Sequence, residues 1–317
     1  MMIETINLTR KFNGITAVNS LSLSVKKGEI FAFVGPDGAG KTTTMRMLTA
    51  IMDPTEGEAR VAGFDIRTEG ESLREHIAYM SQRFGLYEDL TVEENMVFYA
   101  DLYDIPYKER PALTEKLLSF SQMKPFRKRL AGNLSGGMKQ KLGLACALIH
   151  KPDVLFLDEP TNGVDPISRR EFWGILYELL QEEVTIFVST AYLDEAERAN
   201  NVGFIHKGNL LLCDTPSGMA KKFPFMLMAV KSSDNRRARD ILNKDPLIVK
   251  CKIFGEYLHV MLEKYFKEWD KIWKKLEDNG LQIYEKRQVK PSLEDCFINL
   301  VEEEGGKRFP YSGFLNK

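Results

Sequence analysis

A glycine-rich segment near residue 40 combines the residue types that bind phosphate. It reads GPDGAGKT from Gly35 to Thr42 and follows a short apolar run, EIFAFV. Glycines let backbone N–H groups converge on phosphate oxygens, and a helix that begins here adds a partial positive charge. Lys41 can reach the terminal phosphates, and the hydroxyl of Thr42 can bind Mg²⁺. A chance glycine turn is the alternative, but the strand before the segment and the helix after it favour a nucleotide site.

Two carboxylates end a second apolar run further along the chain. The sequence from Val154 reads VLFLDE, so Asp158 and Glu159 follow four apolar residues. A carboxylate at a strand tip can hold Mg²⁺ through water, and the next one can polarise an attacking water as a general base. An exposed acidic strand end is the alternative. The phosphate-binding segment in the same chain favours a magnesium ligand at Asp158 and a catalytic base at Glu159.

A third segment, LSGGMKQ from Leu134 to Gln140, opens an apolar helical run. The hydroxyl of Ser135 and the N–H groups of Gly136 and Gly137 would form a second anion-binding helix start. Taken alone, such a segment is more often only a helix cap. One chain cannot easily place two phosphate cradles on one nucleotide. The segment therefore favours a dimer in which this cradle closes on the partner's nucleotide.

Composition limits the class of protein. The 317 residues are 44% hydrophobic and 28% charged, which is typical of a soluble globular chain. The net charge of -1 gives no global attraction to nucleic acid, and the short basic run at 124–129 favours a solvated face. Four cysteines without paired spacing argue against a zinc site or a disulfide framework. No signal peptide is expected, and no apolar run approaches the roughly 18 residues of a membrane helix.

The hydrophobic pattern predicts an α/β domain followed by a smaller domain. Strands alternate with helices over residues 1–218, and helical periodicity predicts an insertion at about 88–149 that a capping box at Thr91 opens. Strands and helices then mix, with one strand expected at 247–253, so residues 219–303 are predicted to form a small α+β domain. The glycine-rich tail, 304–317, is expected to be loose.

Residues 1 to about 216 resemble the ATP-binding subunit of an ABC transporter of the drug- or lipid-export type. The phosphate loop, the LSGGMKQ segment and the VLFLDE strand carry the resemblance. It implies a P-loop NTPase core of the RecA-like kind, with an antiparallel β-subdomain and a helical insertion. It also implies ATP and Mg²⁺ as cofactors. The smaller domain resembles the C-terminal extension of such proteins, best in PSLEDCF (Pro291 to Phe297), and its role is either regulatory, dimerising or merely stabilising.

The resemblance implies further site residues. Phe12 matches the aromatic residue that stacks on adenine, although a core phenylalanine is the alternative. Gln82 matches the glutamine that senses Mg²⁺ and water and links to the membrane subunit. Asp165 matches the aspartate that crosses the dimer interface, a role compatible with a helix N-cap. Contacts to the nucleotide are expected along the whole phosphate loop, from Gly35, Asp37, Gly38, Ala39, Gly40, Lys41, Thr42 and Thr43.

The resemblance also implies partners. These are a transmembrane permease, received by the surface at 83–95, and a second ABC cassette, either an identical chain or a histidine-bearing partner. The chain would lie on the cytoplasmic face of the cell membrane as a peripheral subunit, and no nucleic-acid partner is expected. Soluble ABC proteins of translation or DNA maintenance are the rival class. They usually carry two cassettes or a long coiled-coil insertion, and the sequence predicts neither.

The segment VSTAY from Val188 to Tyr192 departs from the family pattern. The family normally carries a histidine at position 191 that contacts the γ-phosphate, and this chain has Ala191. Losing one preorganised donor typically costs about 10²–10³ in rate. The sequence is therefore similar to the first, non-histidine cassette of fused two-cassette exporters, and it predicts slow hydrolysis of its own nucleotide. The alternatives are a homodimer with two impaired sites, a site that tolerates alanine, an engineered alanine, and a nucleotide-gated subunit that barely hydrolyses ATP.

Overall fold

The computed structural model describes residues 1–82 and 85–304. Backbone contacts divide the chain into one unit at Met1–Pro216 and a second at Ser217–Lys317, and each is described by itself. The predicted tail, apart from Glu304, and the first two positions of the surface at 83–95 lie outside the described residues. None of the helices within the described ranges is both long enough and apolar enough to cross a membrane.

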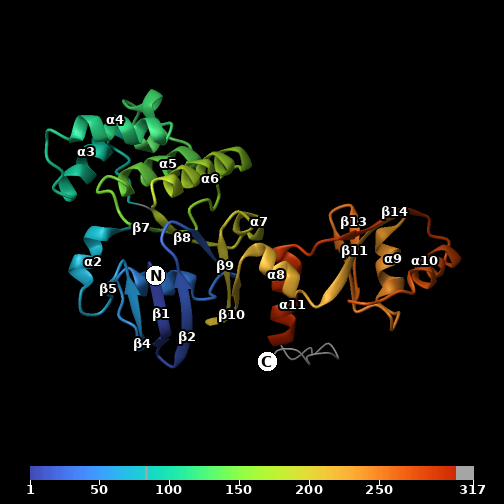
Figure 1. Ribbon diagram of the computed structural model, residues 1–317. Helices are drawn as coiled ribbons and strands as arrows, with labels where there is room; N and C mark the ends of the chain where they lie inside the picture. Colours follow the sequence, from blue (N-terminus) through green and yellow to red (C-terminus); the bar gives the residue numbers. More distant parts are fainter. Residues whose placement is uncertain (83–84, 305–317) are drawn as a thin grey trace. The chain divides into compact units, whose positions relative to one another are not determined.

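A six-stranded sheet forms the centre of the first unit, in the order β10-β9-β3-β8-β7-β6 (Figure 1). Strands β9, β3, β8, β7 and β6 run parallel, and β10 closes one edge as the antiparallel half of a hairpin with β9. Every residue of β3, β7 and β8 is buried, as expected for a parallel sheet covered on both faces. The bounds are β3 Ile30–Val34, β6 Ile77–Met80, β7 Val154–Asp158, β8 Thr185–Thr190, β9 Asn201–His206 and β10 Asn209–Asp214.

Aromatic side chains fill the core between this sheet and its helices. The rings of Phe31 and Phe187 stack with centroids 5.1 Å apart, and Phe156 lies 5.7 Å from Phe187 on the next strand. Methionines of the first helix, Met45 and Met47, are buried in the same cluster. This packing joins three strands to one helix in a single core. The helices are α1 Lys41–Leu48, α2 Gly70–His76, α6 Pro166–Gln181 and α7 Leu193–Ala196.

A second sheet of the first unit is antiparallel, in the order β2-β1-β4-β5. Its strands carry apolar residues from the same core cluster, such as Ile3, Leu21 and Val61. Strand β1 ends at Phe12, the residue predicted to stack on adenine. The bounds are β1 Ile3–Phe12, β2 Ile15–Val25, β4 Glu56–Val61 and β5 Phe64–Asp65.

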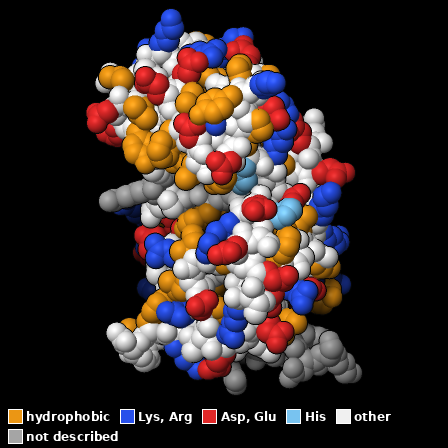
Figure 2. All heavy atoms as spheres, turned by 90° about the vertical axis from the view of Figure 1, so that its left-hand side faces the viewer, with side chains coloured by type: hydrophobic (Ala, Val, Ile, Leu, Met, Phe, Trp, Pro, Cys, Tyr) orange, Lys and Arg blue, Asp and Glu red, His pale blue; other side chains and the backbone are white. Residues whose placement is uncertain are grey.

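The predicted helical insertion is drawn in green in Figure 1. Its capping box is confirmed, because the Thr91 side chain accepts the Glu94 N–H while the Glu94 carboxylate accepts the Thr91 N–H. Figure 2 shows orange side chains gathered on the upper part of one face. Exposed hydrophobic residues of this part of the chain include Tyr87, Leu102 and Tyr103. The elements are α3 Val92–Leu102, α4 Arg110–Phe120, η1 Lys124–Phe126, η2 Ala131–Asn133 and α5 Gly136–Ala147.

The second unit contains a four-stranded antiparallel sheet, in the order β12-β13-β11-β14. Helices α9 and α10 contribute Leu242 and Trp273 to the core on one face of this sheet. The strand expected at 247–253 begins only at Lys250, because the Asp245 side chain accepts the Leu247 N–H and holds a turn there. The elements are α8 Pro216–Lys222, β11 Phe225–Ser232, α9 Asn235–Leu242, β12 Lys250–Phe254, β13 Tyr257–Glu263, α10 Trp269–Asp278, β14 Ile283–Val289 and α11 Leu293–Glu304.

Candidate nucleotide site

A cavity of about 370 Å³ lies where the carboxyl ends of β3 and β7 meet the start of α1. Ligands of open α/β folds bind at this edge of the sheet. The cavity brings together the phosphate loop, Gln82 and Glu159, as the sequence predicted, and it adds Ala17 and Asn162, which the sequence did not predict. Its lining residues are Ala17, Asp37, Gly38, Gly40, Lys41, Thr42, Thr43, Gln82, Glu159 and Asn162.

Two phosphate-loop glycines are required by the backbone. Gly40 has φ +110°, and a Cβ there would lie 2.4 Å from the carbonyl oxygen of Ala17. At Gly35 a Cβ would lie 2.2 Å from the carbonyl oxygen of Ile205. Ala39 is buried behind the loop. Helix α1 begins at Lys41, so the first-turn N–H groups that no helix can satisfy internally lie at the cavity.

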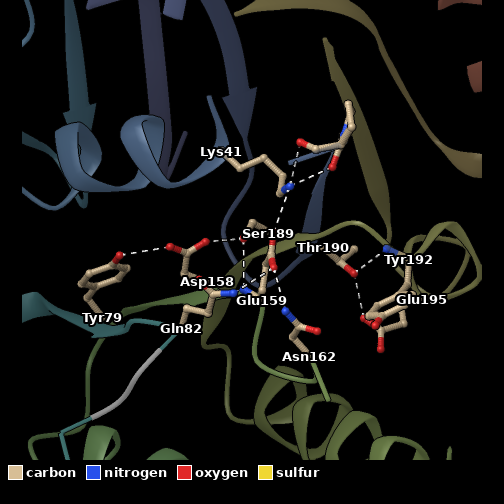
Figure 3. A network of polar contacts seen from close by, with 12 residues as sticks. Lys41, Tyr79, Gln82, Asp158, Glu159, Asn162, Ser189, Thr190, Tyr192 and Glu195 are labelled. Atoms are coloured by element: carbon tan, nitrogen blue, oxygen red, sulfur yellow. Dashed lines mark hydrogen bonds and ion pairs between the residues drawn. The ribbon is translucent and has the colours of Figure 1, made fainter. Parts of the chain in front are cut away.

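Lys41 is held in place at several contacts, as Figure 3 shows. Its ammonium group donates to the carbonyl oxygens of Gly35 and Pro36, at 2.8 and 3.1 Å. It also forms an ion pair with Glu159 at 3.0 Å, and the Lys41 side chain is only 4% exposed. The positive charge predicted for phosphate binding is thus present at the cavity wall. In this state the Glu159 carboxylate neutralises it.

Glu159 has a strained backbone with φ +50°, in the left-handed region. Such a conformation costs about 1–3 kcal/mol for a residue other than glycine, and it persists only where surrounding contacts impose it. Here the Glu159 N–H is placed between the carbonyl and hydroxyl oxygens of Ser189, each at 3.1 Å. The Gln82 and Asn162 amides donate to the Glu159 carboxylate at 3.4 and 3.3 Å. The carboxylate is therefore aimed into the cavity beside Lys41.

Asp158 lies behind Glu159 and is 1% exposed. Its two oxygens accept hydrogen bonds from the Ser189 hydroxyl at 2.6 Å and from the Tyr79 hydroxyl at 3.3 Å (Figure 3). Burial, with the neighbouring Asp158 charge, raises the pKa of Tyr79 to about 12, so its hydroxyl keeps its proton and donates. Two donors thus fix the orientation of the carboxylate that the sequence assigns to Mg²⁺.

The residues present fit a nucleoside triphosphate with Mg²⁺. The anion side is supplied by a lysine, by helix N–H groups and by the unobstructed space around Gly38, where a Cβ would meet nothing within 4 Å. The cation side offers a hydroxyl at Thr42 and an amide oxygen at Gln82 in the cavity lining, with the buried carboxylate of Asp158 behind it. These oxygen donors are the ligand types that Mg²⁺ prefers.

Sheet order places position 191 at the same edge of the sheet as the cavity, outside the residues that line it. Strand β8 lies between β3 and β7, with Thr190 beside Val34 and Ser189 beside Asp158. Ala191 follows directly and is exposed. The position therefore opens between the phosphate loop and the carboxylate pair. Its methyl group offers no hydrogen-bond donor.

The other predicted residues lie away from the cavity lining. Ser135 caps α5 by accepting the Met138 N–H at 3.3 Å, and the neighbouring Gly136 is exposed with nothing within 4 Å of a Cβ. Gly137 instead packs on α6, where a Cβ would lie 2.6 Å from that of Ser168. This cradle and the cavity are separate features of one chain.

Phe12 and Asp165 are also outside the lining. Phe12 is 37% exposed at the end of β1, with the guanidinium of Arg10 4.6 Å from its ring centroid. Asp165 is the N-cap of α6, since its carboxylate accepts the N–H groups of Ile167 and Ser168, both at 3.0 Å. Asp165 therefore acts as a helix N-cap in this chain.

Sequence reasoning missed the residues that support the site from neighbouring strands and loops. They are Tyr79, Thr161, Asn162, Ser189 and Glu195. Ser189 could have been found, because it is a polar residue at the end of an apolar strand beside the one that carries Asp158. Tyr79 and Thr161 carry no local signal, since their partners lie on other elements. Asn162 contacts Glu159 within one loop, and Glu195 contacts Thr190 five residues before it, but neither spacing forms a recognisable motif. A buried carboxylate, Glu195, has its pKa raised chiefly by that burial.

Known proteins match this chain along most of its length. A family model described as "ABC transporter" matches residues 18–162. The chain is 41% identical over 318 residues to the "Probable multidrug ABC transporter ATP-binding protein YbhF" of Escherichia coli (strain K12), a match that covers 98% of this chain and 54% of that protein. It is 32% identical over 302 residues to the "Bacitracin transport ATP-binding protein BcrA" of Bacillus licheniformis, with 95% and 97% covered. The chain thus spans 54% of the length of YbhF and nearly all of BcrA.

Solved structures share the fold of the first unit. A chain described as cbiO1 from Clostridium perfringens, part of the ABC transporter complex cbiONQ, matches with a TM-score of 0.65 and 26% identity over 70% of this chain and 91% of its own. An "ATP binding subunit of ABC transporter" matches with a TM-score of 0.64 and 27% identity over 70% and 93%. The P-loop NTPase fold predicted from the sequence is confirmed. By its phosphate loop, its carboxylate pair and these relatives, the chain belongs to the ATP-binding proteins of the ABC transporter family.

Proposed function

We propose that this chain binds ATP with Mg²⁺ and hydrolyses it to drive a separate membrane permease, and that Ala191 slows hydrolysis at its own site. The observation that carries the proposal is the placement of Glu159. Its strained backbone, its ion pair with Lys41 and its amide contacts hold one carboxylate at the wall of the phosphate cavity. Strain of this kind is maintained where a precise position is needed.

The chain's own residues have distinct roles in this reaction. Lys41 exchanges its carbonyl and carboxylate partners for phosphate oxygens, which releases Glu159 to accept a proton from the attacking water. Gln82 and Asn162 already contact the Glu159 carboxylate and would keep it oriented. Bound Mg²⁺, held by Thr42, Gln82 and, through water, Asp158, would neutralise charge on the phosphates. Phe12 would stack on the adenine.

We infer that the active form is a head-to-tail pair of cassettes. Ser135, Gly136 and Gly137 lie outside the cavity, and Gly136 is exposed with free space around it. They would close on the nucleotide of the facing cassette, with Asp165 at the interface. Because the defect at Ala191 affects only this chain's own nucleotide, a histidine-bearing partner would gain a complete site.

The permease would dock on the helical insertion. Its exposed hydrophobic residues, such as Leu102, Tyr103 and Tyr107, favour contact with another protein over solvent. The relatives include a probable multidrug transporter protein and a bacitracin transport protein, which favours an exporter. The chain would then be peripheral, on the cytoplasmic face of the membrane.

Head-to-tail closure is tested by complementation between two variants that are each inactive alone. One chain carries Ala191→His and Gly136→Asp, so its own site gains the missing donor while its cradle gains a negative charge. The other carries Glu159→Gln with an intact cradle. We expect ATP turnover only after mixing, because the mixed pair alone combines a histidine, Glu159 and an intact cradle on one nucleotide.

Gly136 suits this design because the space around it accepts a side chain without disturbing α5. The matched control mixes the first chain with a Glu159→Gln chain that also carries Gly136→Asp, and it should stay inactive. An inactive mixed pair, alongside an active Ala191→His chain, would contradict the composite site. A second candidate function, a nucleotide-gated subunit that barely hydrolyses ATP, is favoured by Ala191. It would show tight ATP binding without turnover even in the Ala191→His chain.

Ser189→Ala should weaken Mg²⁺ binding at this site. The hydroxyl of Ser189 donates to Asp158 and receives the Glu159 N–H, and hydrogen bonds to charged groups contribute about 1.5–3 kcal/mol. We therefore expect the Mg²⁺ concentration for half-maximal turnover to rise roughly tenfold or more. Titration of Mg²⁺ at fixed ATP measures this. Ser189→Thr keeps the hydroxyl and should shift it less, and an unchanged Mg²⁺ requirement in Ser189→Ala would refute the role.

A further inference from the structure

Glu195 is a buried carboxylate that connects the loop after β7, which begins with Glu159, to the end of β8, which Ala191 follows. It is 1% exposed and belongs to the short helix α7 after β8. One oxygen accepts the hydroxyl of Thr161 at 2.5 Å, and the other accepts the hydroxyl of Thr190 at 3.0 Å. Thr161 lies in the loop after β7, and Thr190 ends β8. One side chain thus bridges the loop of Glu159 and the loop of Ala191.

Arg169 of α6 closes this arrangement from a third element. Its Nε lies 3.1 Å from the Glu195 carboxylate, as an ion pair without the alignment of a hydrogen bond. Its guanidinium lies over the ring of Tyr192, 4.2 Å from the ring centroid. The charged groups facing Glu195 are therefore Arg169 and, on its own helix, the exposed Asp194. Arg169 therefore also contacts Tyr192, the residue directly after position 191.

The hydrogen bonds fix the backbone at both catalytic positions. The Thr190 hydroxyl donates to Glu195 and accepts the Tyr192 N–H at 2.9 Å, so the two contacts enclose Ala191 (Figure 3). In the other loop, the Asn162 N–H donates to the Glu159 carbonyl at 3.1 Å, directly beside Thr161. Moving the Glu195 carboxylate would therefore shift position 191 relative to Glu159.

A stabilising role alone does not account for this choice of residue. A carboxylate at full burial loses its hydration, and an apolar side chain of similar volume often stabilises a core as well or better. The partners of Glu195 are Thr161 in the loop after β7, Thr190 at the end of β8 and Arg169 of α6. Position 191 also keeps its enclosing contacts although its side chain is only a methyl group.

We propose that Glu195 is a positioning residue that holds the loops after β7 and β8 together and keeps position 191 in the geometry of a γ-phosphate contact. The inference rests on the proposed ATPase function. Its consequence is that a histidine placed at position 191 acts only while Glu195 holds the loop. A misplacement of about 1 Å can cost about 10²-fold in rate, so a modest loop shift would remove most of the gain.

A double-mutant cycle tests this coupling. Turnover is measured for the unaltered chain, Ala191→His, Glu195→Gln and the combination, with KM and kcat determined separately. We expect the gain from histidine to fall about tenfold or more in the Glu195→Gln background, in kcat, while KM for ATP changes little. Asp194→Asn, which removes the same charge from the adjacent exposed position, should leave the gain intact. An equal gain with and without Glu195 would overturn the proposal.

Hydrogen exchange separates this proposal from the ATPase function. In Glu195→Gln, the amides of Tyr192 and Asn162 should exchange faster, while the core amide of Phe33 keeps its rate. If Ala191→His gives no turnover at all, the proposed ATPase function is wrong. The exchange result alone then decides whether Glu195 holds the two loops together. Unchanged exchange at Tyr192 and Asn162 would overturn the proposal that Glu195 positions these loops. So would a uniform acceleration that includes Phe33, because it would show a general loss of stability instead.

Discussion

Replacing Ala191 by histidine should raise the ATP turnover of this chain by about 10²–10³-fold, the typical worth of one preorganised donor at a developing negative charge. The rest of the site is already arranged. Lys41 and Glu159 line one cavity, and β8 places position 191 between the phosphate-loop strand and the carboxylate strand. The added imidazole would supply the missing N–H donor. Steady-state phosphate release from the purified chain measures the effect, with kcat carrying the gain.

Ala191→Leu is the matched control, because leucine approaches histidine in size and has no polar donor. It should leave turnover at the level of the unaltered chain. Robust turnover of the unaltered chain would contradict the model in which an impaired chain pairs with a histidine-bearing partner. It would make the chain a self-sufficient homodimer that tolerates alanine. An equal gain from leucine would show that the loop responds to bulk and not to a donor.

The phosphate loop was predictable because its chemistry is local. Gly35 and Gly40 are demanded by backbone approach to neighbouring strands, Lys41 follows directly, and the helix start supplies the N–H groups. All of these are encoded within eight consecutive positions. The carboxylate pair was predictable for the same reason, since Asp158 ends an apolar strand and Glu159 follows it directly. The P-loop fold follows from such segments in their order along the chain.

The supporting residues were not predictable because sheet order decides them. Ser189 meets Asp158 only because β8 inserts between β3 and β7, a pairing over 31 positions that no single segment displays. The contact of Glu195 with Thr161 depends on the same insertion. In the second unit, the strand expected at 247–253 starts late because a hydrogen bond from the Leu247 N–H to the Asp245 carboxylate competes with strand pairing. Local pattern thus predicts ligands of the nucleotide, and tertiary contacts determine what orients them.

Glu159→Gln in the Ala191→His chain should lower turnover by about 10²–10⁴-fold, which is the usual contribution of a general base. Glutamine keeps the shape of the side chain and the amide contacts of Gln82, but it cannot take a proton from water. ATP binding should persist or tighten, because Lys41 would no longer have to leave an ion pair at 3.0 Å to meet the phosphates. Turnover and equilibrium ATP binding, measured on the same preparation, separate these two effects.

Lys41→Ala provides the contrast, since it removes the phosphate contact and should weaken binding itself. A Glu159→Gln chain that retained turnover within about tenfold of its parent would fall short of a general base's usual contribution and exclude Glu159 as that base. The strained φ of +50° at this residue would then need another cause. Loss of turnover with intact binding would instead tie the strain to catalysis. The N–H contacts from Glu159 to Ser189 would then be seen as the means by which the fold holds a base that the backbone alone would release.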